Sequence, residues 1–164
     1  MTRVGCYPGS FNPLTVAHLA VAEAARDAGA LDRVDLVLSR EALGKDAVAD
    51  EELEDRLAQL RSAAAAHDWL GVALTEHRLV VDIAQGYDVV VMGADKWRQV
   101  NDPDWYPDTA ARDAAVARLP RALVAPRGDD EPDDVELLDL DPAHRAVSSS
   151  AVRAGHPRAA GWSA

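Results

Sequence analysis

The residues best suited to chemistry lie near the start of the chain, in the block Gly9–His18 (GSFNPLTVAH). A glycine turn there enters a helical pattern, and the unpaired N–H groups and positive dipole end of a helix start favour an anion. Thr15 and His18 are three residues apart, so they share one face of the first helical turn. Together they offer a hydroxyl and an imidazole to one phosphate group. Taken singly, each has a structural alternative, with Thr15 as a helix cap and His18 as an ordinary surface or core histidine.

Three further segments carry groups that suit the same chemistry. Ser149, Ser150 and Arg153 place hydroxyls at a helix start and an arginine one turn later, within reach of the same anion. Serine clusters cap many helices, so this segment gains weight only when it is paired with the first block. The other two are Gly44-Lys45 and the run 93–97 (GADKW), each of which follows an apolar run.

Short β-branched runs and alanine-rich helical patterns alternate along the chain and must position these groups. Strands are expected at 3–7, 34–38, 70–74, 89–92 and 122–125, with an edge strand at 135–140. Helices are expected at 15–28, 51–66, 79–85, 108–119 and 149–154. This alternation predicts an α/β fold, a Rossmann-like doubly wound parallel sheet in a single domain (1–164) with a short irregular tail from about 155.

Ligands of doubly wound sheets bind beyond the carboxyl ends of the strands, near the point where the strand order reverses. The loops of interest are therefore those expected at 8–13, 40–48 and 93–106. The acidic stretch 127–134 (RGDDEPDD) is interpreted as a solvated loop.

Composition and missing motifs exclude several classes of protein. The 164 residues carry a net charge of −11, which predicts no nucleic-acid partner and no anionic-membrane partner. One cysteine cannot form an intramolecular disulfide, and the N-terminus lacks the apolar core of a signal peptide, so we expect a cytoplasmic protein. No P-loop, GxGxxG, HExxH or CxxC motif is present, which argues against kinase-like and dinucleotide-oxidoreductase functions.

The first block resembles the signature of the HxGH/TxGH nucleotidyltransferase superfamily, roughly G-[ST]-F-[DN]-P-x-[HT]-x-G-H. Seven residues match that signature: Gly9, Ser10, Phe11, Asn12, Pro13, Thr15 and His18. Ala17 departs from it, because the superfamily has a glycine there. The run 147–153 (VSSSAVR) resembles the second signature, I-S-[ST]-[ST]-x-[IV]-R. The resemblance implies that His18 and Thr15 bind phosphates, and that Ser149, Ser150 and Arg153 bind the nucleotide triphosphate.

Within the superfamily, the run 93–97 resembles nicotinamide or nicotinate mononucleotide adenylyltransferases. That resemblance implies that Gly93 lets ATP approach, that Asp95 contacts ribose and that Lys45 meets the acceptor phosphate. It also implies that Trp97 and Trp105 stack on the pyridine ring; the alternative is that these tryptophans pack on the domain edge.

Other members of the superfamily remain open. The opening YPGSFNPLTVAH, the chain length and the run 79–82 (LVVD) are closer to phosphopantetheine adenylyltransferase, but that enzyme's G-L-R after the fourth strand is absent. A cytidylyltransferase is a further alternative, as is a nucleotide-binding module that has lost catalysis, which Ala17 and the short C-terminus would suit.

The resemblance therefore implies that an acceptor phosphate attacks the α-phosphate of ATP in line and releases pyrophosphate, with CTP as the second candidate nucleotide. Catalysis would come from positioning and from stabilisation of charge. Mg²⁺ is expected to arrive with the nucleotide, without a protein-only cage. Small-molecule substrates are the expected partners. A homo-oligomer stays open, and the sequence does not identify the acceptor.

Overall fold

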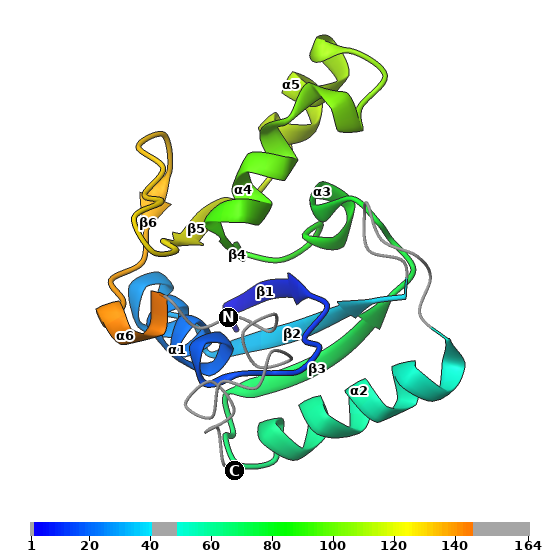
Figure 1. Cartoon of the computed structure of the whole chain (residues 1–164), viewed down its shortest axis with the longest axis vertical. Helices are drawn as coiled ribbons and strands as arrows, with labels where there is room; N and C mark the ends of the chain where they lie inside the picture. Colours follow the sequence, from blue (N-terminus) through cyan, green and yellow to red (C-terminus); the bar gives the residue numbers. More distant parts are fainter. Residues whose placement is uncertain (1, 41–48, 146–164) are drawn as a thin grey trace.

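The computed structural model describes residues 2–40 and 49–145 (Figure 1). Its centre is a parallel sheet with the strand order β3-β2-β1-β4-β5-β6. The strands are β1 (Val4–Gly9), β2 (Arg33–Ser39), β3 (Leu70–Thr75), β4 (Val89–Gly93), β5 (Arg121–Ala125) and β6 (Glu136–Leu137). The helices are α1 (Val16–Gly29), α2 (Asp50–Ala64), α3 (Val80–Ile83), α4 (Ala94–Asn101), η1 (Pro103–Trp105), α5 (Thr109–Ala117) and α6 (Pro142–Arg145). The predicted doubly wound, Rossmann-like sheet is confirmed.

Strand β4 explains the two-layered core. Its side chains alternate between faces, so Val89 and Val91 join the cluster that contains α1 and α2. Val90 and Met92 join a second cluster with α3 and α4 on the opposite face. A strand that is covered on both faces can be apolar at every position, which is why β4 reads as one continuous run. The helices therefore lie on both sides of the sheet (Figure 1).

The strand order fixes the location of a ligand site. Strand β1 lies between β2 and β4. The chain adds β2 and β3 on one side of β1 and then β4, β5 and β6 on the other, so the strand order reverses between β1 and β4. The carboxyl ends of these two strands are Gly9 and Gly93. A ligand of this fold class is expected beside them.

The structure corrects two local predictions. Residues 93–106 are not a loop, because most of them form α4 and η1. Ala94, Trp97 and Val100 recur at helical spacing and are buried, so burial of this narrow stripe stabilises the helix. Strand β1 also continues through Pro8 to Gly9, which pair with Val37 and Leu38. Beyond Cys6 the strand has no pairing with β4, and proline is tolerated where a strand lacks a second neighbour.

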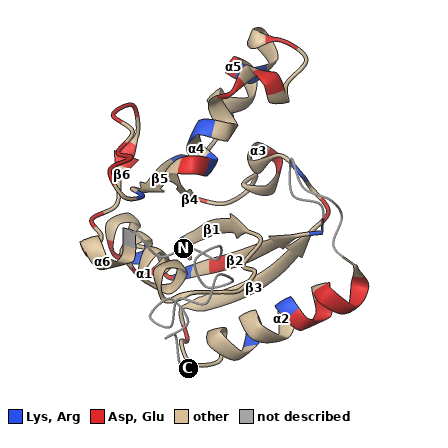
Figure 2. Ribbon diagram, in the orientation of Figure 1, with Lys and Arg blue, Asp and Glu red and all other residues tan. Residues whose placement is uncertain are grey.

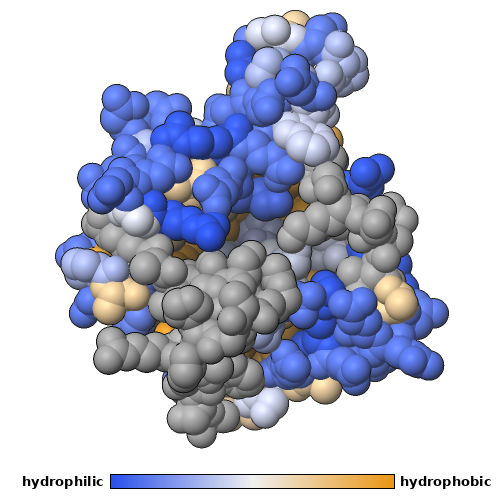
Figure 3. Space-filling view, viewed as in Figure 1, coloured by the Kyte–Doolittle hydropathy of each residue, from blue (hydrophilic) through white to orange (hydrophobic). Residues whose placement is uncertain are grey.

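Acidic residues dominate the outer surface. Figure 2 shows them along α2, on α4 and α5, and around β6. Hydrophilic residues cover most of the face in Figure 3, with small apolar areas between them. None of the helices in the described ranges has the length and apolar character needed to cross a membrane.

Candidate active site

The structure brings six of the predicted site residues to the β1–β4 edge. Gly9 ends β1, Ser10 and Phe11 follow it, and Thr15 and His18 open α1. Across the switch point, Gly93 ends β4 and caps α4. Asp95, a seventh predicted residue, lies in the first turn of α4. The predictions for Lys45, Ser149, Ser150 and Arg153 fall outside the described residues.

Thr15 and His18 form a reciprocal helix cap. The backbone N–H of Thr15 donates to Nδ1 of His18 over 2.9 Å, and the backbone N–H of His18 donates to Oγ1 of Thr15 over 3.4 Å. Oγ1 also lies 3.2 Å from Nδ1. This arrangement is a capping box in which a histidine replaces the usual glutamate or glutamine. The structural alternative for Thr15, a helix cap, is therefore confirmed.

Aromatic rings surround the imidazole of His18. The ring centroid of Phe11 lies 5.1 Å from that of His18, and the centroid of Tyr7 lies 6.2 Å away, both in edge-to-face geometry. Burial among these rings lowers the pKa of His18 from 6.5 to about 4. At neutral pH the imidazole is therefore uncharged. Because Nδ1 accepts a backbone hydrogen bond, the proton of the neutral ring resides on Nε2.

Phe11 supports this ring from an unusual backbone position. It has a φ of 44° and is only 2 % exposed, so it is held in the left-handed region by its packing. A Cβ added at Gly9 would lie 2.9 Å from Cζ of Phe11. Gly9 therefore leaves room for the phenyl ring, and the ring in turn packs on His18. In this structure both residues act on the site through the packing of the Phe11 ring against His18.

Gly93 is an open position at the same edge. It has a φ of −79° and precedes α4 without a side-chain cap. A Cβ built there would meet no atom within 4 Å. Nothing in the described fold requires glycine at this position, so the space in front of it suits a ligand that approaches the backbone closely.

Asp95, the predicted ribose contact, has a partner that the sequence did not indicate. Its carboxylate accepts a hydrogen bond from the guanidinium of Arg127, which follows β5. A second ion pair joins Arg98 to Asp130 one turn further along α4. The acidic stretch 127–134, predicted as a solvated loop, is thus tied to α4 at several points. Arg127 adds a cation to the carboxyl edge of the sheet.

The two predicted pyridine-stacking residues differ in exposure. Trp97 is 8 % exposed, packs in the α3–α4 core and donates from Nε1 to Asp134 over 3.0 Å. Its position matches the packing alternative. Trp105 lies in η1 with 38 % of its surface exposed, so its ring is available to a ligand.

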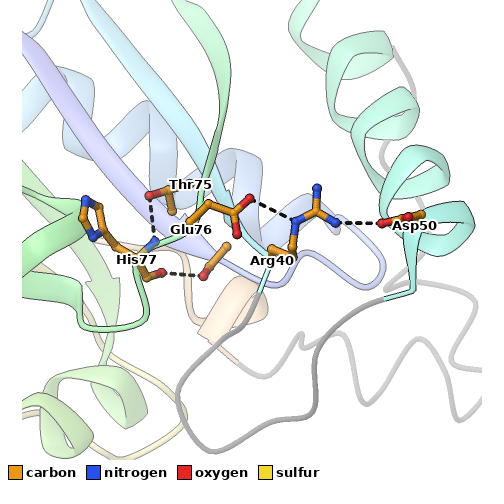
Figure 4. Close-up of polar contacts among 6 residues, drawn as sticks. Arg40, Asp50, Thr75, Glu76 and His77 are labelled. Carbon is orange, nitrogen blue, oxygen red and sulfur yellow. Dashed lines mark hydrogen bonds and ion pairs between the residues drawn. The ribbon is translucent and has the colours of Figure 1, made fainter.

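A further polar cluster lies where β2 and β3 end (Figure 4). Arg40 donates to Glu76 over 3.0 Å and to Asp50 over 2.7 Å, and these contacts raise its pKa. Ser39 donates to the backbone oxygen of His77 over 2.6 Å. Asp50 begins α2, so Arg40 links the ends of two strands to a helix start. No local motif indicates this cluster, because its members come from three separate segments.

The described residues give no cage for a metal ion. Within 2–40 and 49–145, no three His, Cys, Asp or Glu side chains are grouped so that they could hold one. The expectation that Mg²⁺ arrives with the nucleotide therefore stays a prediction.

Two solved structures share the fold. Plasmodium falciparum nicotinic acid mononucleotide adenylyltransferase complexed with NaAD matches 94% of this chain and 83% of its own, with a TM-score of 0.71 and 15% identity. The same protein complexed with APC matches the same shares, with a TM-score of 0.67 and 16% identity. At this identity the likeness concerns the fold.

Sequence comparison gives one match over part of the chain and one over most of it. A probable nicotinate-nucleotide adenylyltransferase of Trichlorobacter lovleyi is 37% identical over 65 residues, which is 40% of this chain and 30% of that relative. The match thus spans less than a third of the relative's length. The pattern of the cytidylyltransferase-like family covers residues 6–155, from β1 past the second predicted motif. The superfamily resemblance is confirmed, and the chain belongs to the cytidylyltransferase-like family.

Proposed function

We propose that this protein is a nucleotidyltransferase that transfers AMP from ATP to the phosphate of nicotinate or nicotinamide mononucleotide. The observation that carries the proposal is the neutral His18 at the start of α1, beside the switch point of the sheet. Its Nε2–H is a donor held in place before any ligand binds. Preorganised donors of this kind stabilise charge that develops on a phosphate in the transition state.

The reaction needs no covalent intermediate on the protein. A phosphate oxygen of the acceptor attacks the α-phosphorus of ATP, and the bond from that phosphorus to the bridging oxygen of the β-phosphate breaks. Pyrophosphate leaves with the electron pair of that bond. His18 donates to a phosphate oxygen as negative charge shifts toward the leaving group, and the backbone N–H groups at the start of α1 favour the same anion.

The other predicted site residues enter the proposal with different support. Gly93 stands at the edge with open space before it, which supports a close approach of ATP. Asp95 is exposed and paired with Arg127, so it is held at the edge for the ribose contact. Ser10 is half-buried in the loop before α1. Lys45, Ser149, Ser150 and Arg153 enter on their sequence motifs alone.

Electrostatics support a site that relies on neutral donors. Arg40 and Arg127 both lie at the carboxyl edge, and both already form ion pairs with carboxylates. Their net positive field is therefore small. A neutral N–H donor such as His18, together with backbone N–H groups, can bind phosphate without a large local excess of cations.

The choice of acceptor rests on the relatives and on Trp105. The curated relative is named as a nicotinate-nucleotide adenylyltransferase, and the solved neighbour carries NaAD. The exposed indole of Trp105 offers a flat surface to a pyridine ring, whereas a phosphopantetheine arm has no ring at its reacting end. The family description keeps CTP as the alternative nucleotide.

Mg²⁺ would be held mainly by the nucleotide phosphates, where it would offset their charge. We propose no step that depends on a protein ligand to this ion.

A pyrophosphate-release panel tests the proposal. Nicotinate mononucleotide, nicotinamide mononucleotide and 4′-phosphopantetheine would each be offered with ATP and with CTP. We expect turnover with ATP and a pyridine mononucleotide. Turnover with phosphopantetheine alone would replace the acceptor, turnover with CTP alone would replace the nucleotide, and ATP binding without turnover on any acceptor would indicate a non-catalytic module.

A further inference from the structure

Thr15 is placed where it cannot serve as a phosphate ligand without moving. Its side chain is fully buried, with 0 % of the residue exposed. The hydroxyl lies 3.4 Å from the backbone nitrogen of His18 and 3.2 Å from its Nδ1. Both contacts of the hydroxyl are therefore with His18. A buried hydroxyl that already has two partners offers no surface to a third group.

The same contacts determine what His18 can do. A neutral imidazole has one donor and one acceptor nitrogen. The backbone N–H of Thr15 occupies Nδ1 as the acceptor, which leaves Nε2–H as the donor. The hydroxyl of Thr15 lies on the same side of the ring and can donate to Nδ1 as well. Two groups of one residue thus favour the same tautomer.

Packing restricts the ring from its other sides. Phe11 and Tyr7 contact it edge-to-face, and these two rings contact each other at a centroid distance of 5.4 Å. The imidazole is therefore held by the cap at Nδ1 and by aromatic neighbours. In such a setting, loss of the hydroxyl would loosen the ring rather than empty a phosphate-binding position.

We propose that Thr15 is a positioning residue, which fixes the orientation and tautomer of His18 so that Nε2–H is presented to the phosphate, and that Thr15 does not itself bind the phosphate. The kinetic part of this inference rests on the proposed function. The tautomer part concerns the protein without substrate and stands apart from it.

Nuclear magnetic resonance of the ¹⁵N-labelled, ligand-free protein tests the tautomer directly. We expect the wild-type His18 ring to carry its proton on Nε2. In Thr15→Val, which replaces the hydroxyl with a methyl group of similar size, we expect a detectable population with the proton on Nδ1. A wild-type proton on Nδ1 would overturn the proposal, and so would identical ring spectra in the two proteins.

Kinetics separate positioning from direct contact. We expect Thr15→Val to lower kcat by about 10- to 100-fold, the scale associated with a small misplacement of a catalytic group, with the KM values for ATP and acceptor unchanged. Thr15→Ser restores the hydroxyl and should recover most of the lost kcat. A raised KM with kcat retained would show that Thr15 contacts a substrate and would overturn the proposal.

Control variants separate a loss of stability from a loss of positioning. Thr15→Val removes a helix cap, which costs about 1 kcal/mol of stability. Ala58→Gly, at an exposed position in the middle of α2, costs a similar amount without touching the site, and its kcat should match the wild type. If Thr15→Val does not fold, the smaller Thr15→Ala takes its place. If the wild type turns over no acceptor, the proposed function fails and the resonance experiment still decides the role of Thr15.

Discussion

Replacing His18 with glutamine exchanges the proposed ring donor for a flexible amide while preserving the helix cap at this position. The capping box needs an acceptor for the backbone N–H of Thr15, and Nδ1 of His18 supplies it over 2.9 Å. Glutamine is a usual residue at this position of a capping box, because its side-chain oxygen accepts the same hydrogen bond. His18→Gln therefore retains the cap and loses the ring N–H together with the aromatic contacts.

The expected loss of activity follows from the part that is removed. A single preorganised donor to a charge that develops in the transition state contributes about 10²–10³ in kcat. Loss of the edge-to-face contacts with Phe11 and Tyr7 costs stability on the order of 0.5–1.5 kcal/mol for each pair. We therefore expect kcat to fall by about 10²–10³ with the KM for ATP nearly unchanged, in a protein that stays folded.

Steady-state pyrophosphate release, with thermal unfolding of the same samples, measures both quantities. His18→Ala is the matched variant, since it removes the donor and the cap acceptor together. It should lose at least as much kcat as His18→Gln, and more stability. Alanine has no donor, whereas the amide of glutamine still carries N–H groups. A near-normal kcat in folded His18→Ala would therefore remove His18 from the site and refute the mechanism.

Three other predictions concern the pH dependence of stability, the open glycine and the two tryptophans. Because the fold lowers the pKa of His18 from 6.5 to about 4, folding favours the uncharged ring, and this contribution is present above pH 6.5 and lost as the pH falls toward 4. Between about pH 7.5 and about pH 5, the free energy of unfolding measured with denaturant should therefore fall by up to about 2 kcal/mol more in the wild type than in His18→Gln. If the free energies of unfolding of the two proteins changed in parallel with pH, the burial of this ring would be contradicted. Gly93→Ala should change unfolding free energy by less than about 0.5 kcal/mol, since a Cβ there meets no atom within 4 Å, but should raise the KM for ATP; an unchanged KM would exclude close approach. Trp105→Ala should raise the KM for the mononucleotide by an amount equivalent to a loss of about 1–3 kcal/mol in binding free energy. Trp97→Ala should instead lower the free energy of unfolding by about 3–5 kcal/mol. If Trp97→Ala raised the KM and Trp105→Ala destabilised the fold, the two roles would be exchanged.

Local pattern predicted most of the fold, because each element is specified by its own side chains. The continuous apolar run at 89–92 predicted a strand covered on both faces, and β4 is such a strand. The segment 93–106 was misassigned because α4 buries only three residues among polar ones, which is a weak helical signal. The spacing of Ala94, Trp97 and Val100 was the indication available in the sequence.

The candidate site was predicted less completely, because its contacts join distant segments. Residues 9–18 are contiguous, so the motif located His18 and its cap without knowledge of the fold. The pairing of Asp95 with Arg127 spans 32 residues, and that of Trp97 with Asp134 spans 37. Such contacts depend on how β4 and β5 lie side by side, and no local spacing encodes them. Burial of Thr15 and Trp97 likewise follows from packing.

We propose that the chain joins AMP to a pyridine mononucleotide through the acceptor's own phosphate. Nicotinate mononucleotide labelled with ¹⁸O in its phosphate group, incubated with unlabelled ATP and the wild-type protein, tests this claim directly by mass spectrometry of both products. We expect a dinucleotide that retains all of the label, including the bridging oxygen, and unlabelled pyrophosphate in equal amount. The absence of any dinucleotide, or the appearance of label in pyrophosphate, would contradict it.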